Sequence, residues 1–307
     1  MASSTFPPEL LDSIFCLLPP QDLISVASAS YTLNAVAHRT LYRNITITPA
    51  TNNLSVLDTL AAHPHTATHV RTFSITIHNE QPHTFPTLLA KALEQMNELT
   101  SLTLFLDADA TCALNSEARY PNLTSFATSF PFDANLANFL GRTPAIVDLQ
   151  VGAALPSSDQ PEISLPPTSI PQLARFTGPY HTARVIVPQR PVEALFLSQV
   201  ISDDSVFGQL SQSKSNITIF DAVVSLGLLP CVAAISQTMP SLHYLRLMTV
   251  APLDDHFDSV RRHSSQIYFR SLILFHPDTL PTALRRPWFH VGPYLFRVFR
   301  DAVDMLA

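Results

Sequence analysis

The pattern of apolar and polar residues divides the chain into a helical start and a longer part of alternating strands and helices. Between Pro8 and Leu18 the apolar residues recur at the spacing of one helix face: Leu10, Leu11, Ile14, Leu17 and Leu18. Pro8 suits a first helical position, and Pro19-Pro20 ends this helix and starts a second. A third helix is predicted from near Thr32 to Leu41, and Ile45-Thr46-Ile47 then alternates like a strand.

The helical start is too short to bury a complete core by itself. We therefore expect residues 1–43 to be a docking module that completes its packing on a partner. The alternative is a helical cap that packs on the domain that follows. A docking module would leave Leu10 exposed in the isolated chain, whereas a cap would bury it.

An apolar pattern at positions i, i+3 and i+5 recurs nine times beyond residue 69, with first positions about 25 residues apart. The segments are Val70-Phe73-Ile75, Leu99-Leu102-Leu104, Leu123-Phe126-Thr128, Ile146-Leu149-Val151, Leu173-Phe176-Gly178, Val192-Leu195-Leu197, Ile217-Phe220-Ala222, Leu242-Leu245-Leu247 and Phe269-Leu272-Leu274. Helical stretches lie between several of them. A strand–helix unit of this size cannot bury its apolar face alone, so neighbours are expected to stack. The alternative is a non-repeat α/β domain with irregular strands.

The sequence of the first forty-three residues resembles the F-box family. The resemblance rests on Pro7-Pro8-Glu9-Leu10-Leu11, on Leu17-Leu18-Pro19-Pro20-Gln21-Asp22-Leu23 and on the closing Leu41-Tyr42-Arg43. The chain departs from the family at Phe6-Pro7, where Leu-Pro is common, and at Ala29-Ser30 and Leu33, where Val-Ser and an aromatic are common. The resemblance implies a substrate receptor of an SCF-type ubiquitin ligase that docks on a Skp-family adaptor and, through it, on a cullin.

The same resemblance implies which residues contact the adaptor: Phe6, Pro7, Leu10, Leu11, Ile14, Leu17, Leu18, Pro20, Asp22 and Leu23. The rest of the chain resembles the degenerate leucine-rich repeats often joined to F-boxes, in a style common in mushroom-type fungi. The family's Asn or Cys eight residues after the first Leu is missing, since the chain has residues such as His78, Asp107 and Val250 there. An unidentified protein substrate would meet outward-facing strand residues: Asp148, Arg175, Phe196, Tyr244 and Arg246.

The expected fold is therefore α/β, a three-helix F-box followed by an irregular leucine-rich-repeat-like solenoid. The expected divisions are the docking module at 1–43, a linker helix with a lead-in strand at 44–69, and the repeats at 70–307. The last of these ends in an aromatic-rich capping helix between Pro287 and Leu306.

Composition excludes several classes of protein. The chain is 46% hydrophobic and 14% charged, so it can bury a large core and is not disordered. Its 18 Lys and Arg residues are scattered and the net charge is −6, which argues against a nucleic-acid partner. There is no basic and apolar leader and no run of about 20 apolar residues, so we expect a cytoplasmic or nuclear protein without a membrane partner. Three distant cysteines predict neither disulfides nor a Cys-based metal site, and each is expected to be a small core residue.

Candidate chemistry is sparse. His63, His65 and His69 have a spacing that could hold zinc, but they lack a fourth ligand, and surface histidines in a turn are the simpler interpretation. Pairs of acidic residues follow several expected strands: Asp107 with Asp109, Asp203-Asp204 and Asp254-Asp255. Catalytic carboxylates often lie at strand ends, but so do carboxylates of solvated loops. GxSxG, GxGxxG and GxxxxGK[ST] are absent. We expect no enzyme, no cofactor and no metal. A repeat scaffold unrelated to ubiquitin is the main alternative function, and a hydrolase with strand-end acids is the weaker one.

Overall fold

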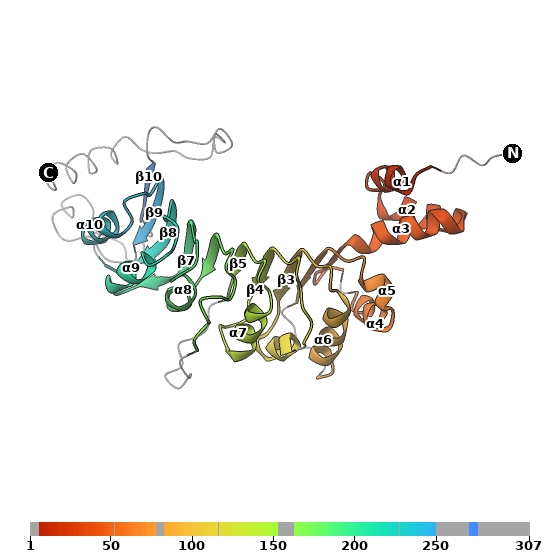
Figure 1. The fold of residues 1–307 in the computed structure, drawn as a ribbon, viewed down its shortest axis with the longest axis horizontal. Coiled ribbons are helices and arrows are strands. Elements are labelled where there is room, and N and C mark those ends of the chain that lie inside the picture. The colour runs from red at the N-terminus through yellow and green to blue at the C-terminus, as the bar shows by residue number, and fades with distance from the viewer. Residues whose placement is uncertain are drawn as a thin grey trace, which may run out of the picture. The chain divides into compact units, whose positions relative to one another are not determined.

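The structure, a computed structural model, describes residues 6–51, 53–77, 83–115, 117–152, 163–226, 228–249 and 270–275. Its contacts divide the described chain into two units. Unit 1 contains the described residues up to 152 together with 163–170, and unit 2 begins at Pro171. Each unit combines parallel strands with helices, so the predicted mixed α/β class with a helical start is confirmed (Figure 1).

Unit 1 opens with the three predicted helices, α1 (Pro8–Phe15), α2 (Pro20–Ala29) and α3 (Tyr31–Arg43). Helix α1 ends at Phe15, three residues before the predicted end at Leu18. Leu17 and Leu18 lie in a turn whose N–H groups donate to the carbonyls of Ile14 and Phe15 at 3.1 and 3.0 Å.

Five parallel strands pair in chain order in unit 1: β1 (Asn44–Ile47), β2 (Thr72–Thr76), β3 (Ser101–Phe105), β4 (Ser125–Thr128) and β5 (Asp148–Gln150). The helical connections are α4 (Ser55–Ala62), α5 (Pro64–Ala67), α6 (Phe85–Gln95), the 3₁₀ helix η1 (Ala108–Asn115) and α7 (Ala134–Gly141). Figure 1 shows α6 and α7 on one side of these strands. The lead-in strand predicted at Ile45-Thr46-Ile47 is thus the first strand of the sheet.

Unit 2 continues the alternation of strand and helix. Its elements are β6 (Arg175–Gly178), α8 (Tyr180–Ile186), β7 (Ala194–Ile201), α9 (Ser205–Leu210), β8 (Ile219–Val224), α10 (Leu228–Thr238), β9 (Tyr244–Thr249) and β10 (Arg270–Phe275). Strands β6 to β9 are parallel and adjacent in chain order. Strand β10 pairs with β9 in the antiparallel sense. The apolar spacing predicted that the segment with Leu272 and Leu274 is another parallel strand–helix unit. Its antiparallel pairing shows that it is not.

The core of each unit is a row of apolar side chains in register across neighbouring strands. Ile45, Phe73, Leu102, Phe126 and Leu149 are paired one to the next in unit 1. In unit 2 the corresponding row is Phe176, Leu195, Phe220 and Leu245. All nine side chains are buried. Apart from Ile45, these are the i+3 positions of the apolar pattern, so the pattern identified an inward-facing residue of each strand from β2 to β9.

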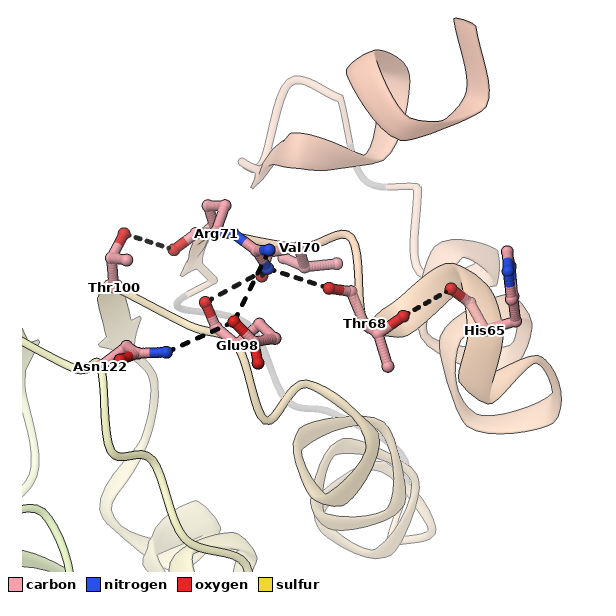
Figure 2. Close-up of polar contacts among 7 residues, drawn as sticks. All are labelled: His65, Thr68, Val70, Arg71, Glu98, Thr100 and Asn122. Carbon is pink, nitrogen blue, oxygen red and sulfur yellow. Dashed lines mark hydrogen bonds and ion pairs between the residues drawn. The ribbon is translucent and has the colours of Figure 1, made fainter. Parts of the chain in front are cut away.

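Threonine side chains add hydrogen bonds at several strand starts. The carbonyl of Arg71 accepts from the N–H groups of Thr100 and Ser101 at 2.8 and 3.1 Å, and it also accepts from the Thr100 hydroxyl at 3.0 Å (Figure 2). The Thr124 hydroxyl donates in the same way to the Thr100 carbonyl, and that of Thr218 to the Glu193 carbonyl. The entries of β3, β4 and β8 are thereby each joined to the preceding strand by a threonine side chain.

The cysteines only partly match the expectation that each is a small core residue. Cys231 is fully buried on α10, but Cys16 and Cys112 are exposed. Cys16 lies just beyond the end of α1, so it lacks the packed helix face that its apolar neighbours suggested. Burial raises the pKa of the Cys231 thiol to about 11.

Several features predicted from sequence lie outside the described residues. They are the capping helix between Pro287 and Leu306, the acid pair Asp254-Asp255, and the repeat positions His78, Val250 and Phe269.

We expect Gly152→Ala to lower the free energy of unfolding by about 1–3 kcal/mol, which is the usual cost of overpacking. A Cβ at position 152 would stand 1.9 Å from the Ser129 carbonyl oxygen, and backbone cannot yield as a side chain can. Urea denaturation measures the change. Gly208→Ala is the matched control, because its Cβ meets nothing within 4 Å on α9 and should be neutral or stabilising. Equal effects of the two substitutions would contradict this packing.

We expect a thiol reagent such as 5,5′-dithiobis(2-nitrobenzoate) to modify Cys16 and Cys112 quickly at pH 8 and Cys231 only slowly. The thiolate is the reactive form, and burial keeps Cys231 protonated at this pH. Adding denaturant should release the third thiol. Rapid reaction of all three in native buffer would show that α10 does not pack as described.

Candidate functional site: the exposed apolar face of the N-terminal helices

Helix α1 presents apolar side chains on two sides, and one side forms a small core. Leu11 and Phe15 are buried against Leu23 of α2 and against Val36 and Ala37 of α3. Partly buried residues surround this core: Leu18, Val26, Ala27, Leu33 and Leu41. The module therefore folds around a modest core of its own, which the argument from chain length had not anticipated.

The other side of α1 is open to solvent. The exposed fractions are 64% for Phe6, 52% for Leu10, 48% for Ile14 and 84% for Leu17, with Ile24 at 62% and Tyr31 at 93%. Across the part of the chain that the structure describes, Val200, at 41%, is the one other large apolar residue in the exposed class. Apolar surface gathered on one small module is the signature of an interaction site.

Polar contacts hold the three helices in fixed positions behind this face. Arg39 of α3 donates two hydrogen bonds to the Asp12 carboxylate of α1, with Nη2–Oδ2 and Nε–Oδ1 distances of 2.6 and 3.1 Å. The Asn34 amide donates to the carbonyl of Ala27 near the end of α2 at 2.9 Å. Ser30 caps α3 by accepting from the Leu33 N–H. The Asp12–Arg39 pair is partly exposed, so it contributes geometry more than stability.

The ten residues predicted to contact an adaptor fall into three groups. Two of them, Leu11 and Leu23, lie in the module's own core, and Leu18 is partly buried. The other seven are exposed: Phe6, Pro7, Leu10, Ile14, Leu17, Pro20 and Asp22. Leu11 and Leu23 can support the surface only from behind. Sequence reasoning did not include Ile24 and Tyr31. Ile24 adjoins Leu23 on α2 yet is exposed while Leu23 is buried, which the apolar run alone does not reveal.

A second candidate surface is the open face of β7, β8 and β9 in unit 2. Phe196, Asp221 and Arg246 are in register on these strands, opposite the buried row. Arg246 forms an ion pair with Asp221 at 3.4 Å and donates to the Met248 sulfur at 3.3 Å. Burial raises the pKa of Asp221, while the positive charge of Arg246 partly lowers it. Arginine, aromatic and methionine side chains are enriched in protein interfaces.

The five residues predicted to meet a substrate are only partly brought together. Phe196 and Arg246 share the row above, and Tyr244 is in register with Ile219 on the next row of the same face. Arg175 is exposed at the start of β6, and Asp148 belongs to unit 1. The open face of unit 1 is different in kind, because its strand residues are small and mostly polar: Ser74, Thr103 and Ala127 on one row, and Thr72, Ser101 and Ser125 on another.

The histidines and acidic residues considered as candidate metal ligands or catalytic groups do not form a site among the described residues. Within the described residues no group of three or more His, Cys, Asp and Glu side chains is placed to hold a metal ion. His65 and His69 meet edge to face with ring centroids 5.0 Å apart, and the His63 ring turns to the Thr59 carbonyl at 3.1 Å. An open cavity of about 620 Å³ beside η1 and α7 has Glu117 and Arg142 among its lining residues. Arg142 uses its guanidinium to bond the carbonyls of Asn138 and Leu114.

No helix of the described part is both long and apolar enough to cross a membrane. No protein of curated function matches this chain in a sequence comparison. Residues 4–48 match the family model described as F-box-like, a range that includes α1, α2, α3 and β1. The exposed apolar face therefore lies on an F-box-like domain, and this match supports an F-box protein.

Proposed function

We propose that the chain is a substrate-recognition subunit of an SCF-type ubiquitin ligase. In this proposal the N-terminal helices dock on a Skp-family adaptor, a cullin is reached through that adaptor, and the chain itself performs no chemistry. The observation that carries the proposal is the exposed apolar face of α1 on an F-box-like domain. F-box domains typically bind adaptors of this type. The cytoplasm or nucleus is the compartment where such a ligase would act.

The geometry of α1 favours docking over capping. A cap would bury Leu10 and Ile14 against the strands and helices that follow, yet both side chains are about half exposed. The module keeps its shape through its own core and through the Asp12–Arg39 pair. A partner helix or groove can therefore receive these anchors without the module having to fold first.

The strand–helix alternation supports a degenerate leucine-rich-repeat solenoid of fungal type as the substrate-holding part. Its apolar positions recur at the proposed spacing, and the i+3 residues from Phe73 to Leu245 lie on strands. Threonine side chains also link the entries of neighbouring strands. The open face of β7 to β9 is the part suited to a protein substrate, because it combines Phe196, Tyr244 and Arg246 within a few residues of exposed Val200.

We expect Leu10→Ala combined with Ile14→Ala to weaken binding to the host's Skp-family adaptor by about tenfold or more, equivalent to about 1.4 kcal/mol or more. Both side chains would lose apolar contact with the adaptor, while neither contributes to the buried core. Co-expression followed by size-exclusion chromatography and calorimetry measures the loss. Val200→Ala, the control, removes an exposed apolar side chain in unit 2 and should bind normally. Unchanged affinity of the double variant would refute adaptor docking through α1 and favour the scaffold alternative.

We expect Phe196→Ser combined with Arg246→Ser to retain the adaptor but to lose substrates. The pair removes an aromatic anchor and the guanidinium that Asp221 orients. Quantitative proteomics of ubiquitinated proteins in host cells, with the native chain and the variant at equal levels, measures the difference. Ser101→Ala combined with Thr103→Ala, on the open face of unit 1, is the control. An unchanged set of ubiquitinated proteins would remove β7 and β9 from the substrate surface.

A further inference from the structure

The ion pair between Asp221 and Arg246 lies among apolar side chains on the open face of unit 2. Several apolar residues on the pair's own row and on the rows beside it are at least partly exposed: Phe196, Val200, Ile219, Val223 and Met248. Strand β9 has a neighbour on each side, β8 and β10, so Arg246 stands inside the sheet and not at its edge. Apolar surroundings strengthen a hydrogen bond made to a charged group.

Of the two charged side chains, the guanidinium is the more accessible. The side chain of Arg246 is 39% exposed and that of Asp221 is 20% exposed. Burial also raises the pKa of Asp221, in keeping with the poor access of its carboxylate to water. A partner that approaches this face therefore meets the positive group before the negative one.

Arg246 uses part of its hydrogen-bonding capacity on weak acceptors. Its Nη1 lies 3.4 Å from the Asp221 carboxylate, its Nη2 donates to the Met248 sulfur at 3.3 Å, and the side chain also hydrogen-bonds the Tyr244 hydroxyl. A guanidinium has five N–H donors, and a thioether sulfur is a weak acceptor. A carboxylate that replaced the sulfur at Nη2 would make a charge-assisted bond, which is roughly twice as strong as a neutral one.

A β-bulge borders this surface. Phe196 pairs with Asp221 and Val200 pairs with Val223, so four residue steps on β7 lie opposite two on β8. Ser198 and Val200, at and beside the bulge, are both exposed. Bulges are common beside functional sites, where they redirect side chains. Val200 thus adds an exposed apolar side chain to the row of Val223 and Met248.

We propose that this surface binds an apolar segment of a partner protein through an Asp or Glu side chain of that segment. The acidic side chain takes the place of the Met248 sulfur at Nη2 of Arg246, and apolar neighbours of the acid contact Phe196 and Val200. A side chain suits the site better than a chain terminus, because partly exposed residues surround Arg246 along β9 and across β8 and the bound segment can continue on both sides. The inference rests on the proposed function, since it names the class of substrate that the ligase subunit would hold.

The first measurement selects peptides on the full-length chain without the adaptor. The probe is a phage-displayed library of random peptides. Selection runs in parallel on the native chain and on the Leu10→Ala/Ile14→Ala chain, and peptides enriched on both are kept, which removes ligands of the α1 face. Enriched peptides should combine Asp or Glu with apolar residues, and their affinity by calorimetry should fall as salt rises. Enriched peptides without an acidic residue, or no enrichment, would overturn the proposal.

The two charged residues should have opposite effects on an enriched acidic peptide. Arg246→Gln removes the anchor and should weaken binding by about tenfold or more. Asp221→Asn removes the carboxylate that competes for the guanidinium and should tighten binding by about threefold. An ion pair that only braces β8 against β9 predicts weaker binding in both variants, and that result would refute the site.

Two further substitutions keep the test decisive if Arg246→Gln is unstable by circular dichroism. Met248→Leu nearly conserves volume but removes the sulfur acceptor from Nη2, so binding should be equal or tighter, and a loss of binding would count against the site. Lys214→Gln is the matched control, because it also removes one positive charge from unit 2 but lies in an exposed position between α9 and β8. It should bind as the native chain does. An equal loss in Lys214→Gln and Arg246→Gln would indicate general attraction between charges and contradict a specific site.

Peptide chemistry separates an acidic side chain from a chain terminus. Changing the enriched Asp or Glu to its amide should abolish binding, whereas amidating the peptide C-terminus should not. The reverse pattern would assign the site to a terminal carboxylate and overturn the proposal.

Adaptor binding is measured separately, so the two proposals can fail independently. A chain that binds acidic peptides but not the adaptor keeps this site and loses the ligase function. A chain that binds the adaptor but no acidic peptide keeps the ligase function and loses this site.

Discussion

The rest of the structure depends on the row of apolar side chains that runs in register across each set of parallel strands. A single strand such as β5 has three residues and one inward side chain, so it has no stability of its own. Placing Phe126 beside Leu102 and Leu149 removes all three from water and fixes the register. A shift of one residue would turn the buried row to solvent, which makes the alignment specific. Every outward-facing position is then determined as well.

A similar division of faces occurs on a smaller scale in the N-terminal helices. Helix α1 has enough apolar residues to pack inward through Leu11 and Phe15 and still present Leu10 and Ile14 to solvent. Because the core is small, the helices are held in place partly by the bidentate Asp12–Arg39 contact. A folded module with an unused apolar face can bind a partner at a low cost in conformational entropy.

Charged residues are few in this chain, and their pairs lie where separate elements meet. Asp12–Arg39 joins α1 to α3, Arg71–Glu98 joins the entries of β2 and β3, and Asp221–Arg246 joins β8 to β9. Such partly exposed pairs contribute modest free energy but restrict geometry.

The sequence by itself determined the helical start, the F-box-like pattern, the mixed α/β class and the inward residue of each strand from Phe73 to Leu245. Periodicity carries this information because one buried face imposes one spacing. Only the tertiary structure decided that Leu11 faces inward while Leu10 faces out, since both lie within the same apolar stripe. It likewise decided that β10 is antiparallel and that Arg39 pairs with Asp12. Strand direction and contacts between distant residues follow from how elements pack, and local spacing does not encode them.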